Sequence, residues 1–257
     1  MRLSANLGFL WPDRPMLERI DAAAAAGFRA VELHWPYDVP PEALSERCAA
    51  AGVAVLALNT PVDRSRGEFG LGALPGREAA FRAGLAAAAD YARRCGAGAV
   101  HVMAGIVPPE VAPGRAADTF AANLGWATAE APDLRLLLEP MNALDQPGYF
   151  YARISQADAM IERVGAGNLA IMLDAYHVGM AGDDPVAELE RFLPRVGHVQ
   201  IAAVPTRHEP DEGRVDHRAL FAALDRLGYR GWVGCEYRPR GDTGAGLAWR
   251  ARLGVAP

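Results

Sequence analysis

The chain has 257 residues, of which 51% are hydrophobic and 22% are charged, and its formal net charge is −5. This length allows one large core and nothing in the sequence resembles a linker, so we expect residues 1–257 to form a single domain. Acidic and basic residues are mixed along the whole length. This mixing argues against a nucleic acid or a membrane as the main partner, because either would require a concentrated basic face.

The first residues and the cysteines indicate the compartment. Residues 2–6 are expected to form a strand rather than part of a secretory signal, and no apolar run approaches the ~20 residues of a spanning helix. Cys48, Cys95 and Cys235 are odd in number and show no CxxC spacing. We expect buried free thiols in a reducing compartment, and therefore a cytoplasmic protein.

Two kinds of segment alternate from one end of the chain to the other. Short apolar runs, expected to be buried strands, cover residues 3–9, 29–34, 53–59, 98–103, 134–139, 168–174, 196–201 and 232–236. Longer runs with helical spacing cover roughly 14–26, 41–51, 76–95, 115–130, 155–164, 185–193, 216–227 and 243–252. Glycine often follows a helix just before the next strand, as at Gly52 and Gly96, which is typical of a left-handed helix end.

Eight strand–helix units in one chain predict a single (β/α)8 TIM barrel. A doubly wound open sheet is the alternative, but the first strand–helix turn, residues 6–12, has no glycine fingerprint for a dinucleotide. Two connections are long, residues 60–75 and 202–215, and both follow strands. We expect them at the carboxyl face of the barrel, as lids or substrate-binding segments.

The last inward-facing residue of each predicted strand is polar. In chain order these residues are Asn6, Glu32, Asn59, His101, Glu139, Asp174, Gln200 and Glu236. Because side chains alternate along a strand, the three acids that end the strands at 134–139, 168–174 and 232–236 should point into the barrel mouth. Converging carboxylates need protons, cationic partners or a metal ion. The structural alternative is that each pairs with an arginine or caps the next helix.

Four of these residues offer oxygen donors, namely Glu139, Asp174, Gln200 and Glu236. Such a set suits a hard divalent cation such as Mg²⁺ or Mn²⁺, whereas zinc would be expected with histidine or cysteine ligands. A metal at a barrel mouth without a phosphate loop indicates Lewis-acid work on a carbonyl group.

Other side chains are candidates for substrate binding. His177 follows Asp174 by three residues, where it can reach a metal-bound ligand or cap a local turn. His101 ends the predicted strand at 98–103 and can either contact the substrate or be a buried structural histidine. Arg207 and Glu209 lie in the long loop after the strand at 196–201, and Arg207 can bind a substrate carboxylate or form a surface salt bridge.

Three further polar residues have structural interpretations. His198 faces the same way as Gln200 but one layer deeper, so we expect a hydrogen-bonded core histidine. Glu32 is expected to form an ion pair inside the barrel. His217 is expected on a helix surface.

Several motifs together resemble one family. They are Ser4-Ala5-Asn6-Leu7, Pro36-Tyr37-Asp38, Pro75-Gly76-Arg77-Glu78, Leu138-Glu139-Pro140-Met141-Asn142, Asp174-Ala175-Tyr176-His177, Gly197-His198-Val199-Gln200-Ile201-Ala202 and Gly231-Trp232-Val233-Gly234-Cys235-Glu236-Tyr237. In order and over nearly the whole chain they resemble hydroxypyruvate isomerases, a group of the xylose-isomerase-like barrels that also include ketose 3-epimerases and endonuclease IV.

The resemblance implies a divalent metal held by the four oxygen donors, with Glu139 and Glu236 as the acid/base pair and His177 near the substrate. It implies interconversion of hydroxypyruvate and tartronate semialdehyde, or isomerisation of a related 2-oxo-tetronate. The chain departs from the family pattern at Ala203, where an aspartate is usual, and at residues 210–214, which replace a Pro-Gly-Thr-Gly-Glu run. Both departures lie in the loop over the pocket and bear on the choice of substrate.

The resulting hypothesis is a 1,2 proton shift through a metal-stabilised cis-enediolate, in which one glutamate removes the proton and the other assists reprotonation. A ketose 3-epimerase is the nearest alternative, because it uses the same carboxylate pair on a neutral sugar. An endonuclease IV-like nuclease for abasic sites and a non-catalytic sugar-acid-binding barrel are more distant ones. A homo-oligomer is compatible with the sequence.

Overall fold

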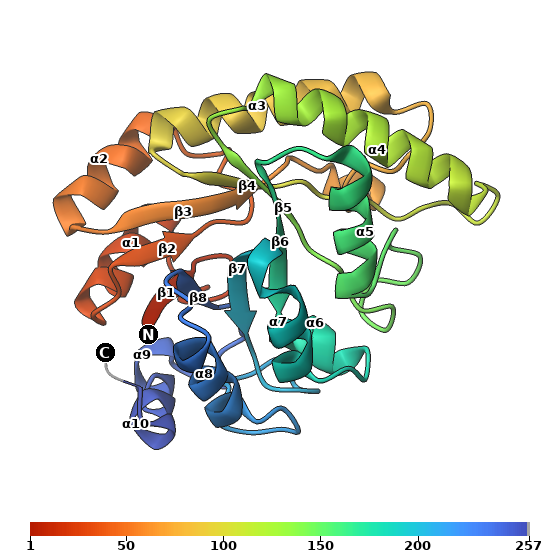
Figure 1. Cartoon of the computed structure of the whole chain (residues 1–257). Coiled ribbons are helices and arrows are strands. Elements are labelled where there is room, and N and C mark those ends of the chain that lie inside the picture. The colour runs from red at the N-terminus through yellow and green to blue at the C-terminus, as the bar shows by residue number, and fades with distance from the viewer. Residues whose placement is uncertain (256–257) are drawn as a thin grey trace.

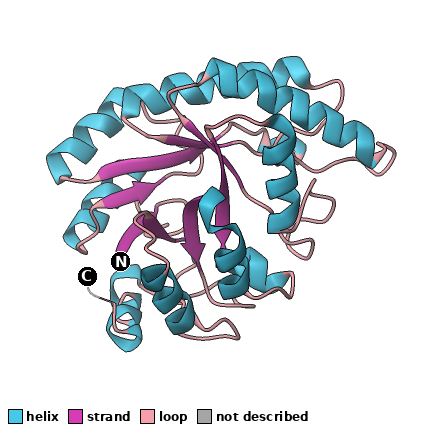
Figure 2. Ribbon diagram, in the orientation of Figure 1, coloured by secondary structure: helices cyan, strands magenta, loops and turns pink. Residues whose placement is uncertain are grey.

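The computed structural model describes residues 1–255, in which eight parallel strands close into a barrel in chain order. Figure 1 shows the chain passing around the barrel from red to blue, with the helices outside the strands. Figure 2 shows the same arrangement as cyan helices around magenta strands. The strands are β1 (Arg2–Asn6), β2 (Ala30–Glu32), β3 (Ala54–Asn59), β4 (Ala99–His101), β5 (Arg135–Leu138), β6 (Leu169–Asp174), β7 (Val196–Ile201) and β8 (Trp232–Cys235).

Helices follow the strands around the outside. They are α1 (Met16–Ala25), α2 (Pro41–Ala51), α3 (Glu78–Cys95), α4 (Pro113–Glu130), α5 (Ile154–Val164), α6 (Ala175–Met180), α7 (Pro185–Phe192), α8 (His217–Arg226), α9 (Thr243–Gly246) and α10 (Trp249–Leu253). Two 3-10 turns, η1 (Arg64–Arg66) and η2 (Leu193–Arg195), complete the described elements.

The predicted (β/α)8 barrel is confirmed and the open-sheet alternative is wrong. β1 pairs with β2 on one side and with β8 on the other, so Ala5 lies beside both Val31 and Cys235 and the sheet has no edge. Each of the eight predicted strand segments overlaps a strand of the barrel. Gly52 and Gly96 end α2 and α3 with φ of 65° and 81°, as their positions predicted.

Two helical segments differ from the prediction. α6 begins immediately after β6, where the backbone N–H of Tyr176 donates to Asp174 Oδ1 at 2.9 Å and caps the helix. It has six residues, which is too short for a periodic pattern to reveal. The predicted helix at 243–252 is divided into α9 and α10, because Gly244 and Gly246 lower helix propensity in its first half.

The apolar core has two parts, as expected for a closed barrel inside a ring of helices. The larger part lies between strands and helices and includes fully buried Leu58 and Phe120. A smaller part fills the barrel interior and consists of Ala57, Leu137, Ala170 and Met172. Polar side chains therefore occupy the rest of the barrel interior, above this apolar layer.

Three further expectations concern the cysteines, His217 and membrane-spanning helices. Cys48, Cys95 and Cys235 are buried free thiols, as predicted. His217 is 2% exposed and packs near Phe221, so its expected place on the helix surface is wrong. It is the first residue of α8, and its ring turns toward the core. Within residues 1–255, the helices are too short or too polar to cross a membrane.

Leu58→Ala should lower the free energy of unfolding by about 2–5 kcal/mol, because it leaves a cavity in a fully buried part of the core. Urea denaturation monitored by circular dichroism measures this change. Leu144 is 73% exposed, so Leu144→Ala is the matched control and should change stability by less than about 0.5 kcal/mol. Equal effects of the two substitutions would contradict this assignment of the core.

Candidate active site

A cavity of about 210 Å³ opens at the carboxyl ends of the strands. Residues at or just after the end of every strand line it: Gly8, Phe9, His34, Trp35, Asn59, Met103, Glu139, Met141, His177, Arg207, Glu236 and Arg238. The two long loops also reach it, through Phe69 of the first and Arg207 of the second. Of the side chains predicted to meet at the barrel mouth, Asn59, Glu139 and Glu236 line this cavity, and both predicted loops reach it.

Glu236 is 5% exposed and receives polar contacts on both of its oxygens. Oε1 accepts a hydrogen bond from Asn6 Nδ2 at 3.1 Å and lies 2.8 Å from His34 Nε2. Oε2 accepts from Arg207 Nη2 at 3.0 Å. Burial alone would raise the pKa of this carboxyl, but the contacts from His34 and Arg207 outweigh it and hold the pKa well below its usual range. Glu236 is therefore kept ionised.

Arg207 enters the site from the loop after β7. Its guanidinium lies against the rings of Phe9 and Tyr176, at 5.0 Å and 4.6 Å from their centroids, and Nη2 is 3.6 Å from Asp174 Oδ2. Its backbone has φ of 55°, a left-handed conformation that is unfavourable for a residue with a Cβ atom. Backbone strain of this kind costs about 1–3 kcal/mol and is concentrated at functional sites.

Glu139 has the opposite electrostatic environment from Glu236. Oε2 is 3.3 Å from His101 Nδ1, and Oε1 is 3.6 Å from His177 Nε2. Burial and the nearby Glu236 and Asp174 raise the pKa of the Glu139 carboxyl well above its usual range. Burial also lowers the pKa of both histidines to about 3, so they are neutral near pH 7 and do not offset the repulsion.

Asp174 and Gln200 lie side by side on β6 and β7. Burial and the charge of Glu236 raise the pKa of Asp174 to about 8. Among the described residues, Asp174 Oδ2 and Gln200 Oε1 are buried acceptors that lack a hydrogen-bond partner. Unsatisfied buried acceptors are costly, and a divalent cation would satisfy both of them and lower the raised pKa values. The predicted oxygen donors therefore fit a hard metal ion.

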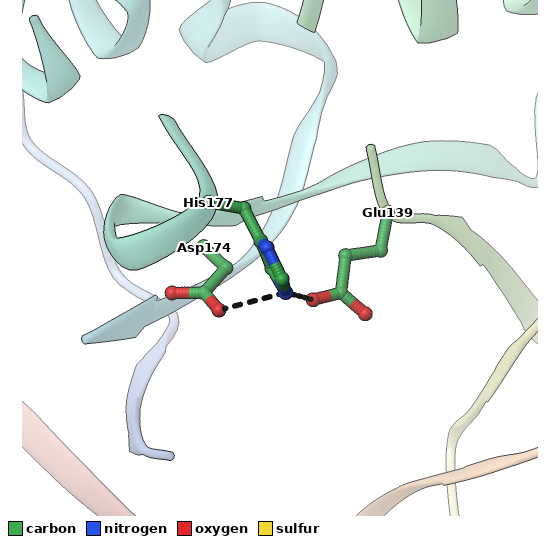
Figure 3. Close-up of side chains that lie close together, drawn as sticks. All are labelled: Glu139, Asp174 and His177. Carbon is green, nitrogen blue, oxygen red and sulfur yellow. Dashed lines mark ion pairs between the residues drawn. The ribbon is translucent and has the colours of Figure 1, made fainter. Parts of the chain in front are cut away.

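A metal-sized group of donor atoms is also formed by Glu139, Asp174 and His177, whose ligand atoms lie within 4.8 Å of one another. Figure 3 shows the His177 ring between the two carboxylates, with its Nε2 atom directed at both. The sequence had placed His177 near the substrate. The geometry alone leaves His177 either as a ligand or as a hydrogen-bond partner of the acids.

Beneath the cavity, Glu32 organises a buried polar network. Its carboxylate accepts hydrogen bonds from Ser4 Oγ and from Gln200 Nε2, the latter at 2.8 Å, and its Oε1 lies 3.0 Å from His198 Nε2. The sequence predicted an ion pair for Glu32 and a hydrogen-bonded core position for His198, and the structure places the two side chains against each other inside the barrel. Burial would raise the pKa of Glu32, but His198 and the hydrogen bonds lower it overall. Because Glu32 binds the amide nitrogen of Gln200, the amide oxygen is left free.

The structure separates two residues that the sequence had grouped. Arg207 lies in the site, but Glu209 does not line the cavity and instead pairs with Arg240 at 2.9 Å. Among the titratable residues that line the cavity, the sequence missed His34 and Arg238. His34 is separated from Glu32 by one residue, and this even spacing was the signal that could have placed it on the same inward face. Arg238 has the same spacing from Glu236.

Comparisons with known proteins agree with this fold. The family described as the xylose isomerase-like TIM barrel matches residues 20–253. A 2-oxo-tetronate isomerase of Cupriavidus necator is 44% identical over 251 residues, which cover 96% of each chain. The hydroxypyruvate isomerase of Escherichia coli K12 is 37% identical, covering 97% of this chain and 98% of its own. A solved structure described as an AP endonuclease of family 2 from Brucella melitensis has a TM-score of 0.94 at 38% identity, covering 98% of both chains.

Glu32→Gln should lower the free energy of unfolding by about 1–3 kcal/mol near pH 7, because it removes the buried negative charge that His198, Ser4 and Gln200 contact. The folded-state pKa of Glu32 lies below the ordinary value of 4.5. The charge therefore stabilises the fold fully above that pH, and this contribution is lost as the pH falls through the lower folded-state pKa. Urea denaturation over this pH range should show the difference between wild type and variant shrinking on acidification.

Glu46 lies on the exposed surface of α2, so Glu46→Gln is the matched control and should have little effect at any pH. A wild-type-like stability for Glu32→Gln would contradict the role given to the Glu32 network.

Proposed function

The chain belongs to the xylose isomerase-like TIM barrel family, in the group of hydroxypyruvate and 2-oxo-tetronate isomerases, and we propose that it isomerises a small 2-oxo sugar acid. In the reaction a proton leaves C3 of the acid and another is delivered to C2, while the hydroxyl proton on O3 passes to O2, so that the carbonyl group moves from C2 to C3. For hydroxypyruvate the product is tartronate semialdehyde. The relative that is 44% identical is named for 2-oxo-tetronate, which makes the four-carbon acid the second candidate substrate.

The observation that carries this proposal is the opposite electrostatic state of two carboxyl groups on one small cavity. The contacts from His34 and Arg207 hold the pKa of Glu236 well below its usual range, whereas burial and the neighbouring Glu236 and Asp174 raise the pKa of Glu139 well above it. Two acids whose surroundings separate their pKa values supply a base and an acid at the same site. We assign proton removal to Glu236 and proton delivery to Glu139.

A divalent cation belongs to the proposed site. Glu139, Asp174, Gln200 and Glu236 would hold Mg²⁺ or Mn²⁺, which when bound would polarise the substrate carbonyl. The free acceptors on Asp174 and Gln200 support this set. Glu32 would keep the Gln200 amide oxygen turned toward the ion through its hydrogen bond to Nε2.

Arg238 supports an acidic rather than a neutral substrate. It lies at the exposed rim of the cavity, 5.7 Å from the Phe9 ring, and no carboxylate of residues 1–255 pairs with it. The neighbouring Arg207 and Arg240 are both engaged by acids. An unpaired guanidinium at the mouth suits a substrate carboxylate, which it can bind through two parallel hydrogen bonds.

The relatives and the alternatives require a direct comparison of substrates. The Brucella structure is described as an endonuclease, but a net charge of −5 and a cavity of about 210 Å³ favour a small acid over duplex DNA. Assays with hydroxypyruvate, a 2-oxo-tetronate, a neutral ketose and nicked-product detection on abasic DNA, each with Mg²⁺ or Mn²⁺, separate the candidates. Turnover of the neutral ketose alone would identify a 3-epimerase, and binding of an acid without solvent exchange would identify a non-catalytic barrel.

Glu139→Gln and Glu236→Gln should each lower turnover at least about 100-fold, because each removes one proton-transferring carboxyl group. The measurement is exchange of substrate C–H protons with deuterated water, followed by NMR. Glu18 is exposed on α1, so Glu18→Gln serves as the control and should keep full activity. Circular dichroism checks that the variants fold, and near-wild-type isomerisation by either site variant would reject the acid/base roles.

Arg238→Gln should raise KM for the sugar acid about 10-fold or more and leave kcat nearly unchanged, since the lost contact is with a group that does not react. Arg230 precedes β8 at the opposite end of the same strand, so Arg230→Gln makes the same charge change away from the cavity. An equal rise in KM for both variants would show a general charge effect and would refute carboxylate binding by Arg238.

A further inference from the structure

The two ring nitrogens of His177 have different surroundings. Nδ1 lies 3.2 Å from the backbone nitrogen of Asn142 and 2.7 Å from the side-chain Nδ2 of the same residue. A backbone N–H can only donate, so Nδ1 must be the acceptor and carries no proton. In a neutral imidazole the proton then resides on Nε2.

The Asn142 amide has its orientation fixed by other contacts. Its Oδ1 accepts hydrogen bonds from the backbone N–H groups of Leu144 at 3.1 Å and Asp145 at 2.9 Å. Its Nδ2 therefore faces His177 and also donates to Asp145 Oδ2 at 3.2 Å. A flipped amide would place its NH₂ group against two backbone donors, so the hydrogen-bond network excludes the flip. Both donors from Asn142 thus converge on Nδ1.

The other nitrogen faces the acids. His177 Nε2 lies 3.6 Å from Glu139 Oε1 and 3.7 Å from Asp174 Oδ2. Figure 3 marks both contacts with dashed lines. The ring is 3% exposed, and a doubly protonated ring would place an N–H at Nδ1 against the backbone N–H of Asn142. A nitrogen that carries a proton cannot donate its lone pair to a metal ion, whatever its distance from the other ligand atoms.

We propose that Asn142 is a positioning residue that holds His177 in the tautomer with the proton on Nε2. His177 is thereby a hydrogen-bond donor to the site and is excluded as a metal ligand, although it is grouped with Glu139 and Asp174. The metal is left to the oxygen donors. The inference deepens the proposed function and depends on it only for the use of this donor in turnover, because the tautomer exists without substrate.

A neutral N–H donor has a chemical advantage in this position. It can stabilise negative charge that develops on a substrate oxygen without releasing its proton to a nearby carboxylate. An imidazole of the opposite tautomer would present a lone pair to the same oxygen and repel it. Asn142 therefore decides whether His177 Nε2 attracts or repels a negatively charged substrate oxygen.

The direct test is two-bond ¹H–¹⁵N NMR of protein labelled with ¹⁵N-histidine, with His177 assigned from the spectrum of His177→Gln. We expect a protonated Nε2 and an unprotonated Nδ1 in the wild-type protein near pH 7. Titration with Mg²⁺ should leave the Nε2 proton in place. A wild-type spectrum with the proton on Nδ1, or loss of the Nε2 proton when Mg²⁺ binds, would overturn the inference.

Two variants test the part played by Asn142. Asn142→Asp places a charged acceptor where the amide nitrogen lies 2.7 Å from Nδ1, and this contact should outweigh the remaining backbone donor at 3.2 Å, so the proton should move to Nδ1 or a second proton should be bound there. Asn142→Ala keeps the backbone donor and should retain the Nε2 tautomer. With the substrate, Asn142→Asp should lower kcat roughly 10–100-fold, as other supporting contacts do, with a smaller change in KM.

The outcomes distinguish this inference from the proposed function. The expected spectra together with an absence of sugar-acid turnover would reject the function and leave the tautomer assignment intact. If Asn142→Asp isomerises the sugar acid fully and keeps the His177 tautomer unchanged, the role given to Asn142 is rejected and the proposed function stands. If Asn142→Asp fails to fold, the wild-type spectrum and its response to Mg²⁺ still decide the question.

Discussion

The central constraint on this molecule is the burial of three carboxyl groups at the ends of three barrel strands. Glu139, Asp174 and Glu236 are each 5% exposed or less, and their mutual repulsion cannot be relieved by water. The surrounding chain responds by stabilising one of them as an anion and leaving two with raised pKa values. An acid/base pair and a demand for a cation both follow from this one electrostatic problem.

Together with His34, Arg207 provides this response, and its loop has an unusual backbone conformation. A left-handed backbone brings its guanidinium between two aromatic rings and onto Glu236 and Asp174. Arg207 thereby contacts two of the acids proposed to hold a metal ion. The strained loop is therefore part of the site.

The amide side chains of Gln200 and Asn142 decide which atoms at the site donate hydrogen bonds and which accept them. Glu32 binds the nitrogen of the Gln200 amide and leaves its oxygen free, whereas Asn142 donates to one nitrogen of His177 and leaves the proton on the other. In both cases a group outside the reacting set decides whether a buried atom donates or accepts. Supporting contacts of this kind commonly change metal affinity or activity 10–100-fold in other proteins.

The sequence by itself determined the barrel, its eight strand positions, and the polar residues at the strand ends, because alternation and helical spacing are local patterns. The same alternation could have revealed His34. Only the tertiary structure decided that Arg207 pairs with Glu236 rather than with Glu209, and that Glu209 pairs with Arg240. It also decided that Asn142 sets the His177 tautomer. These contacts join residues about 30 positions apart and depend on loop conformation and hydrogen-bond direction, which no periodic pattern along the chain encodes.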